Sequence, residues 1–222
     1  MLGQKSTVRL TLGYKLLMAA TGLILVGFLL AHLCGNLLLF AGAEAINQYA
    51  LKLREYPLLL WLARGVLLLS VCGHIYAGIK LSLLNKKARP QAYAKAKRVK
   101  AGFASQSMLL SGLIVLFFIV YHLAHFTFKW THRAMFQFLD EHDVYSMVLL
   151  SFKSPWVTGF YVLSVILLMV HLYHGIRSIF QTLGLNHPKY NLAIKIFGQS
   201  LSVLLAFGFL TLPLSVFFKF LE

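Results

Sequence analysis

Acidic residues are scarce in this chain, which has 6 Asp and Glu residues among 222, against 21 Lys and Arg residues. Charged residues make up 12% of the sequence, whereas soluble domains contain about 25%. Hydrophobic residues reach 59%, and the mean hydropathy is +0.75. This balance excludes an ordinary soluble domain and indicates a membrane protein.

Cysteine is nearly absent as well. The only two cysteines are Cys34 and Cys72, and both lie inside apolar runs. No C-x-x-C-H motif occurs, which excludes covalently attached c-type haem. We expect both thiols to be small buried core residues.

Five apolar runs are each longer than the roughly 18–20 residues needed to cross about 30 Å of hydrocarbon. They predict an all-α membrane protein of a single domain, residues 1–222, with spans at about 14–40, 58–84, 105–128, 155–183 and 194–220. The first run is too long for a signal peptide and reads as a retained helix. Pro57 and Pro155 suit helix starts, and Pro213 should kink or open the last span. A short interfacial helix is expected around 134–139.

The net charge of +15 is concentrated in particular loops, which indicates a topology signal rather than a nucleic-acid surface. The 85–104 loop holds seven Lys and Arg residues and no acid, and the 184–193 loop is also purely basic. The two other loops balance their basic residues with acids. The positive-inside rule therefore predicts a cytoplasmic N-terminus and an outside C-terminus.

Histidines are the unusual residues of the predicted spans. Six of the nine lie there, namely His32, His74, His122, His125, His171 and His174. At about 1.5 Å per residue, His74 and His171 lie about 15 and 18 Å from the cytoplasmic helix ends. His32 and His122 lie about 27 and 26 Å from those ends. These depths predict two layers, about 10 Å apart. Pairs of histidines at one depth suit bis-histidine haem ligation within a bundle.

A repeated heptapeptide surrounds the inner layer: His74-Ile-Tyr-Ala-Gly-Ile-Lys80 and His171-Leu-Tyr-His-Gly-Ile-Arg177. Gly78 and Gly175 lie one turn beyond the histidines and would let a flat porphyrin approach the backbone. Lys80 and Arg177 could contact haem propionates or simply anchor the helix ends at the interface.

The repeat also separates neighbouring histidines. His171 aligns with His74, whereas His174 aligns with an alanine, so His171 is favoured as the ligand. His122 matches the depth of His32 better than His125 does. The alternative for His125 and His174 is a polar contact between helices, and the same could hold for every histidine. A zinc site, with ligands gathered at one point, fits less well.

Several segments resemble the cytochrome b558 family, the five-helix, two-haem membrane anchors of succinate dehydrogenase and fumarate reductase. The resemblance covers all five spans. It rests on Lys15-Leu-Leu-Met-Ala-Ala-Thr-Gly22, Ala31-His-Leu-Cys-Gly-Asn36, Gly42-Ala-Glu-Ala-Ile-Asn47, Ala88-Arg-Pro-Gln-Ala-Tyr93 and Tyr121-His-Leu-Ala-His-Phe126.

The resemblance implies two haem b groups, the inner one bound by His74 and His171 and the outer one by His32 and His122. It also implies a bacterial inner membrane location and two cytoplasmic partners, a flavoprotein with FAD and an iron–sulfur protein. Whether the whole complex forms a dimer is left open. Some relatives carry a proton-conducting glutamate at the position of Met169, so the resemblance does not extend to that pathway.

The expected function is electron transfer between the iron–sulfur partner and a membrane quinone, with succinate chemistry left to the partners. Glu44, Asn47 and Glu55 are candidates for quinone contacts, although their interpretation as solvated loop residues is favoured. Two alternatives remain. One is a dihaem anchor of another quinone-linked enzyme, such as a hydrogenase or formate dehydrogenase. The other is a haem-free helical anchor or transporter.

Overall fold

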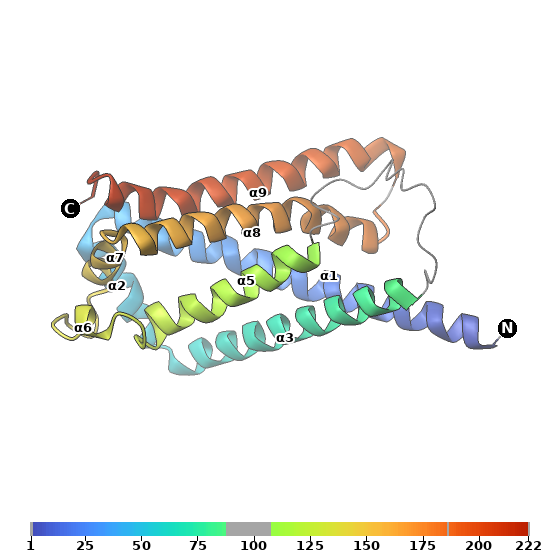
Figure 1. Cartoon of the computed structure of the whole chain (residues 1–222), viewed down its shortest axis with the longest axis horizontal. Coiled ribbons are helices and arrows are strands. Elements are labelled where there is room, and N and C mark those ends of the chain that lie inside the picture. The colour runs from blue at the N-terminus through green and yellow to red at the C-terminus, as the bar shows by residue number, and fades with distance from the viewer. Residues whose placement is uncertain (1, 88–107, 186, 222) are drawn as a thin grey trace.

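The computed structural model describes residues 2–87, 108–185 and 187–221. Five long helices dominate them: α1 (Leu2–Leu37), α3 (Pro57–Lys87), α5 (Met108–His122), α8 (Pro155–Thr182) and α9 (Pro188–Phe217). Each contributes a segment long and apolar enough to cross a membrane, and no strand occurs among the described residues. The predicted all-helical class with five spans is therefore confirmed. The two termini lie at opposite ends of the bundle, as five crossings require (Figure 1).

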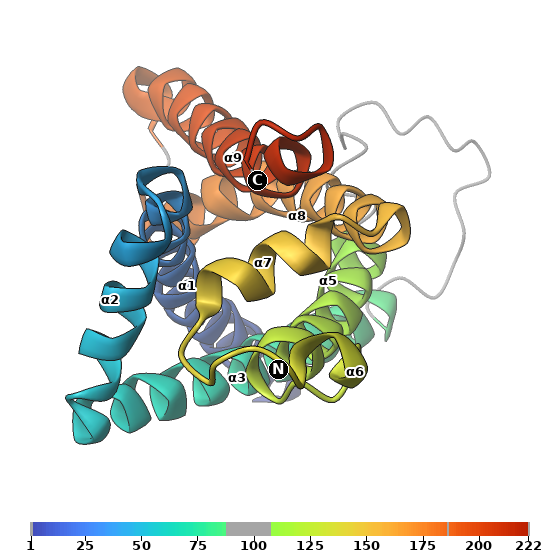
Figure 2. The ribbon, with the colours of Figure 1, turned by 90° about the vertical axis from the view of Figure 1, so that its left-hand side faces the viewer.

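Four of the long helices form a closed ring. Helix α1 packs against α3 and α8, and α5 packs against the same two helices. In the described part of the chain, α1 and α5 share no extensive packing, and neither do α3 and α8. These two pairs are therefore the diagonals of a four-helix bundle. The view along the bundle shows this ring, with α9 lying outside it against α8 and α1 (Figure 2).

Three short helices lie at the end of the bundle that carries the C-terminus: α2 (Ala43–Arg54), α6 (Arg133–Phe136) and α7 (Val144–Phe152). Helix α6 falls where a short helix was expected, but α2 and α7 were not predicted. Helix α7 begins at Asp143, whose carboxylate accepts the Ser146 N–H at 3.0 Å. Its apolar side chains are buried against α8 and α9, so α7 covers the bundle end (Figure 2).

The last span differs from the sequence prediction in two respects. Helix α9 begins at Pro188 rather than near 194, because the His187 ring accepts the Lys189 N–H at 3.2 Å and Pro188 fits the first helical position. Pro213 is buried and does not end α9, which continues to Phe217. The start of the third span at 105 and most of the basic 85–104 loop lie outside the described residues.

Both cysteines contradict their predicted burial, since Cys34 and Cys72 are exposed on the bundle surface. A thiol facing lipid costs little, because the surrounding medium is as apolar as a protein core. Apolar character inside a span therefore does not reveal which face of the helix points inward.

A hydrogen-bonded clamp formed by Asn47 and Asp143 fastens α2 to α7. The Asn47 amide donates to Asp143 Oδ1 at 3.2 Å and accepts the Tyr145 N–H at 3.0 Å. Partial burial alone would raise the pKa of Asp143, but hydrogen bonds from Ser146 and Asn47 outweigh it and lower that pKa. Nearby, Arg54 also donates to His142 Nδ1.

Asn47→Ala should release α2 from α7 and lower the free energy of unfolding in detergent micelles by about 1 kcal/mol. Because the folded-state pKa of Asp143 is lowered, the difference should be full above its unfolded pKa of about 4 and fade as pH falls below it. The exposed neighbour Gln48, changed to Ala, is the control. Equal stability of the two variants would contradict the clamp.

Candidate functional site

The structure brings the predicted histidines together in two pairs. The ring centroids of His74 and His171 lie 6.3 Å apart, with an interplanar angle of 65°. Those of His32 and His122 lie 5.8 Å apart, with an angle of 86°. The 74/171 pair joins α3 to α8, and the 32/122 pair joins α1 to α5. Each pair therefore spans one diagonal of the four-helix ring.

These separations fit a metal held between two imidazoles. Two histidines that bind one metal from opposite sides, with each nitrogen about 2 Å from it, have ring centroids about 6 Å apart. Within residues 2–87, 108–185 and 187–221, no three His, Cys, Asp or Glu side chains converge on one point. A pair supplies two ligands, which is the number that haem iron takes from a protein at its axial positions.

His74 is held by a hydroxyl on the neighbouring helix α1. Thr21 Oγ1 lies 3.2 Å from His74 Nδ1 and donates to the Leu17 carbonyl at 2.7 Å. Thr21 is itself buried. The next residue, Gly22, lies so close that a Cβ there would meet His74 Cε1 at 3.4 Å. The His74 ring thus has the Thr21 hydroxyl beside Nδ1 and the Gly22 backbone beside Cε1.

His171 has the same surroundings on α5. Ser111 Oγ lies 3.2 Å from His171 Nδ1 and donates to the Met108 carbonyl at 3.2 Å. A Cβ at Gly112 would meet His171 Cε1 at 3.3 Å. We call Thr21–Gly22 and Ser111–Gly112 the two imidazole seats.

The seats were missed in the sequence, although a signal for them exists. Residues 21–35 read TGLILVGFLLAHLCG and residues 111–125 read SGLIVLFFIVYHLAH. Both segments begin with a hydroxyl residue followed by a glycine. Thr21 lies eleven positions before His32, and Ser111 lies eleven positions before His122. Eleven residues make close to three helical turns, so seat and histidine share one helix face. The chain therefore carries a second internal repeat, on α1 and α5, beside the repeated heptapeptide.

The register of the seats corrects the predicted distance between the layers. On α1 the 74/171 pair contacts Thr21, and the 32/122 pair begins at His32. Eleven residues of helix correspond to about 16 Å, rather than the expected 10 Å. The earlier value was too small because the helix ends from which depth was counted do not coincide with the structure's helix ends.

The 32/122 pair has different surroundings. The His32 ring stacks on Phe28 with centroids 5.2 Å apart. His122 Nδ1 lies 3.4 Å from the Tyr161 hydroxyl of α8. Among the described residues, no hydrogen bond is made by the His32 ring. This pair therefore has one hydroxyl partner, where the 74/171 pair has two.

His125, the alternative ligand to His122, has no free ring nitrogen. It is completely buried, with Nδ1 3.1 Å from the Tyr161 hydroxyl and Nε2 3.2 Å from Ser151 Oγ of α7. It lies in a π-helical turn, η2 (Leu123–Thr127), that follows α5. This arrangement matches an interhelical polar contact and favours His122 as the residue facing His32.

The remaining predicted residues near the 74/171 pair lie as follows. A Cβ at Gly78 would meet Met18 Cε at 3.4 Å, whereas a Cβ at Gly175 would meet nothing within 4 Å. Exposed Lys80 lies over the Tyr76 ring, 5.6 Å from its centroid. Arg177 and His174 are half-buried on α8. Their proposed contacts with a porphyrin stay predictions.

The three quinone candidates lie on or beside α2. Asn47 belongs to the clamp described above, which gives it a structural role. Glu44 is exposed in the first turn of α2, and Glu55 is exposed directly after its last residue. The structure does not bring these three side chains together at the histidine pairs, and their contact with quinone stays a prediction.

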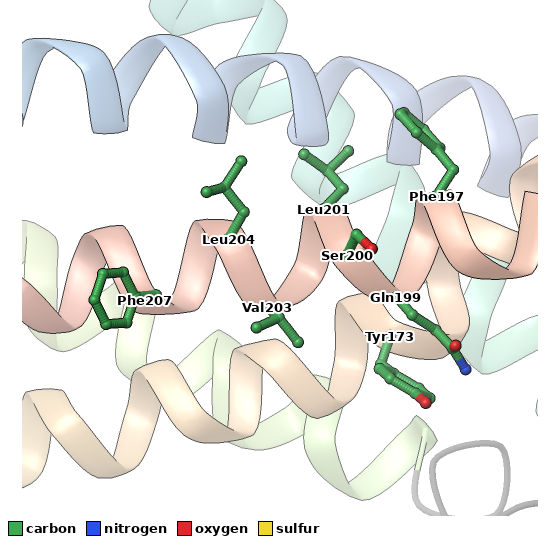
Figure 3. A pocket seen from close by; sticks show the side chains of 8 residues that line it. All are labelled: Tyr173, Phe197, Gln199, Ser200, Leu201, Val203, Leu204 and Phe207. Carbon is green, nitrogen blue, oxygen red and sulfur yellow. The ribbon is translucent and has the colours of Figure 1, made fainter.

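An open groove lies elsewhere, on α8 and α9 (Figure 3). Its walls are mainly apolar, with the polar atoms of Tyr173, Gln199 and Ser200 among them. Several of its side chains are exposed on the bundle surface, among them Phe197, Leu204 and Phe207. None of the four paired histidines lines this groove, so it is separate from the candidate site.

Comparisons with family models, with curated proteins and with solved structures give no match to this chain.

His125→Leu should destabilise the fold while leaving the 32/122 pair in place. The substitution removes one hydrogen bond each from the buried hydroxyls of Ser151 and Tyr161, which keep Met147 O and His122 Nδ1 as partners, and should lower the free energy of unfolding by about 1–2 kcal/mol. Thermal unfolding in detergent measures the loss, and Ser164→Ala is the control because its hydroxyl bonds only its own helix at Phe160 O. A variant as stable as the control would contradict a structural role.

Proposed function

We propose that this chain is a dihaem cytochrome b that anchors a succinate:quinone oxidoreductase in the membrane. The observation that carries the proposal is the placement of two histidine pairs on the two diagonals of one four-helix bundle, at centroid separations of 6.3 and 5.8 Å. The chemistry that bound haem supplies is one-electron transfer at its iron. The assignment to succinate and fumarate enzymes depends on the resemblance to the cytochrome b558 family.

The residues of the chain have distinct tasks in this proposal. His74 and His171 hold one haem b, and His32 and His122 hold the other. The apolar side chains of the ring helices keep water away from both sites, which favours electron transfer over side reactions. About 16 Å of helix separates the two levels along α1.

The rest of the complex follows from the same proposal. The 74/171 pair lies toward the N-terminal end of the bundle, which the positive-inside rule assigns to the cytoplasm of a bacterium. A flavoprotein with FAD and an iron–sulfur subunit would dock there, and electrons would pass through both haems to a membrane quinone. Glu44 and Glu55 lie toward the opposite end and remain the candidates for a quinone site.

A second candidate is favoured by one observation. Thr21, Ser111 and Ser151 each place a hydroxyl within hydrogen-bond distance of a histidine on another helix. A haem-free anchor, whose histidines only link its helices, would have the same contacts. The two candidates differ in whether the Nε2 atoms of the four paired histidines bind a metal.

A reduced-minus-oxidised optical spectrum of the purified chain tests the haem proposal. We expect a b-type α band and two haems per chain by quantitative extraction. His171→Ala and His32→Ala should each remove one haem, because each deletes an axial ligand. His174→Ala, the neighbouring control, should retain both. Absence of the α band from the unaltered chain would favour the haem-free candidate.

Isolation of the chain from its native membrane tests the succinate assignment. We expect it to copurify with a subunit that carries covalent flavin and a subunit that carries iron–sulfur clusters, and the complex should reduce quinone with succinate. A haem-containing complex with a hydrogenase or formate dehydrogenase subunit would instead favour the alternative quinone-linked anchor.

A further inference from the structure

We propose that Thr21 and Ser111 are positioning residues that fix the 74/171 histidine pair in the protonation state and orientation needed to bind haem. The inference rests on the proposed dihaem function and extends it to residues of α1 and α5 that are not ligands. Its basis is that two separate helices present the same seat to two separate histidines.

The proton inventory of each seat determines the histidine tautomer. A hydroxyl has one proton, and Thr21 directs it to the Leu17 carbonyl at 2.7 Å. This contact is shorter than those to the Met18 carbonyl and to His74 Nδ1, both 3.2 Å, so we assign the hydroxyl proton to Leu17 O and the ring proton to His74 Nδ1. Ser111 Oγ lies 3.2 Å from both Met108 O and His171 Nδ1, and by analogy with Thr21 we assign its proton to the carbonyl. A neutral imidazole protonated at Nδ1 has its lone pair at Nε2, where a metal binds.

The glycines of the seats also limit the rotation of the two imidazole rings. The backbone of Gly22 and of Gly112 lies beside Cε1 of His74 and His171: a Cβ would be in ordinary contact at 3.4 Å at Gly22 and in tight contact at 3.3 Å at Gly112. A ring held by its Nδ1 proton and packed at Cε1 cannot turn freely about its bond to Cβ. Both free Nε2 atoms are thereby held in fixed orientations on facing helices, α3 and α8.

The 32/122 pair provides an internal comparison. Only His122 has a hydroxyl partner there, at 3.4 Å, and the His32 ring makes no hydrogen bond with any described residue. An imidazole that donates from Nδ1 is a more basic ligand, and a more basic ligand stabilises ferric over ferrous iron. Removal of a seat hydroxyl should therefore change the midpoint potential and the affinity of the haem at the 74/171 pair more than those of the other haem.

The test compares Thr21→Val and Ser111→Ala with Thr21→Ser and with Ser164→Ala. Thr21→Val keeps the side-chain shape and removes only the hydroxyl, whereas Thr21→Ser keeps the hydroxyl and removes the methyl group. Ser164 is a buried serine on α8 whose hydroxyl bonds the Phe160 carbonyl of the same helix, so Ser164→Ala measures the general effect of losing a hydroxyl. Redox titration of each haem and the rate of haem transfer to apomyoglobin are measured in the whole chain.

We expect the haem at the 74/171 pair to shift to a more positive midpoint potential in Thr21→Val and in Ser111→Ala. Its affinity should fall by roughly 10–100-fold, the usual effect of removing a partner of a metal-bound histidine. The potential and affinity of the other haem should not change. In Thr21→Ser and Ser164→Ala, both haems should have the potentials and affinities of the unaltered chain.

Unchanged potential and affinity in both hydroxyl-free variants would overturn the inference while leaving the dihaem function intact. An equal change in both haems would also overturn it, because a seat acts on one pair only. If the unaltered chain binds no haem, the proposed function itself fails, and that result is visible before any seat variant is compared.

Discussion

An imidazole inside hydrocarbon has two ring nitrogens, and each needs a partner because no water is present to supply one. This requirement accounts for much of the arrangement of the bundle. For the 74/171 pair, Nδ1 of each ring is matched by a hydroxyl on an adjacent helix, and Nε2 is left for whatever lies between the rings. Adjacent helices therefore supply hydrogen bonds, and diagonal helices supply the two sides of each site.

The number of spans and the grouping of histidines by depth could be predicted from the sequence, because both depend on local quantities. Apolar length reports whether a segment can cross a membrane, and the helical rise converts position into depth. The inward face of each helix could not be predicted in the same way. Cys34 and Cys72 illustrate the reason: lipid and protein core are equally apolar, so hydrophobicity does not distinguish the two faces.

The features that sequence reasoning missed depend on contacts between distant segments. Helix α7 is short, and its burial results from packing against α8 and α9 rather than from a strong helical pattern. Asn47 looked like a free polar group near the surface, but its partners lie almost a hundred residues away in the chain. The seats of Thr21 and Ser111 could have been found from the parallel between residues 21–35 and 111–125, once the depth of each histidine was compared with its neighbours.

The crossed diagonals also determine the order in which the chain can assemble. His32 and His122 belong to the first and third spans, so their site is complete once α5 has entered the membrane beside α1 and α3. His74 must wait for His171 on the fourth span, although its seat on α1 is available from the beginning. Helix α9 comes last and contributes no paired histidine. During synthesis, the two sites would therefore be completed in sequence from one end of the bundle to the other, and the fifth span would add Phe209, whose ring centroid lies 5.9 Å from that of His32.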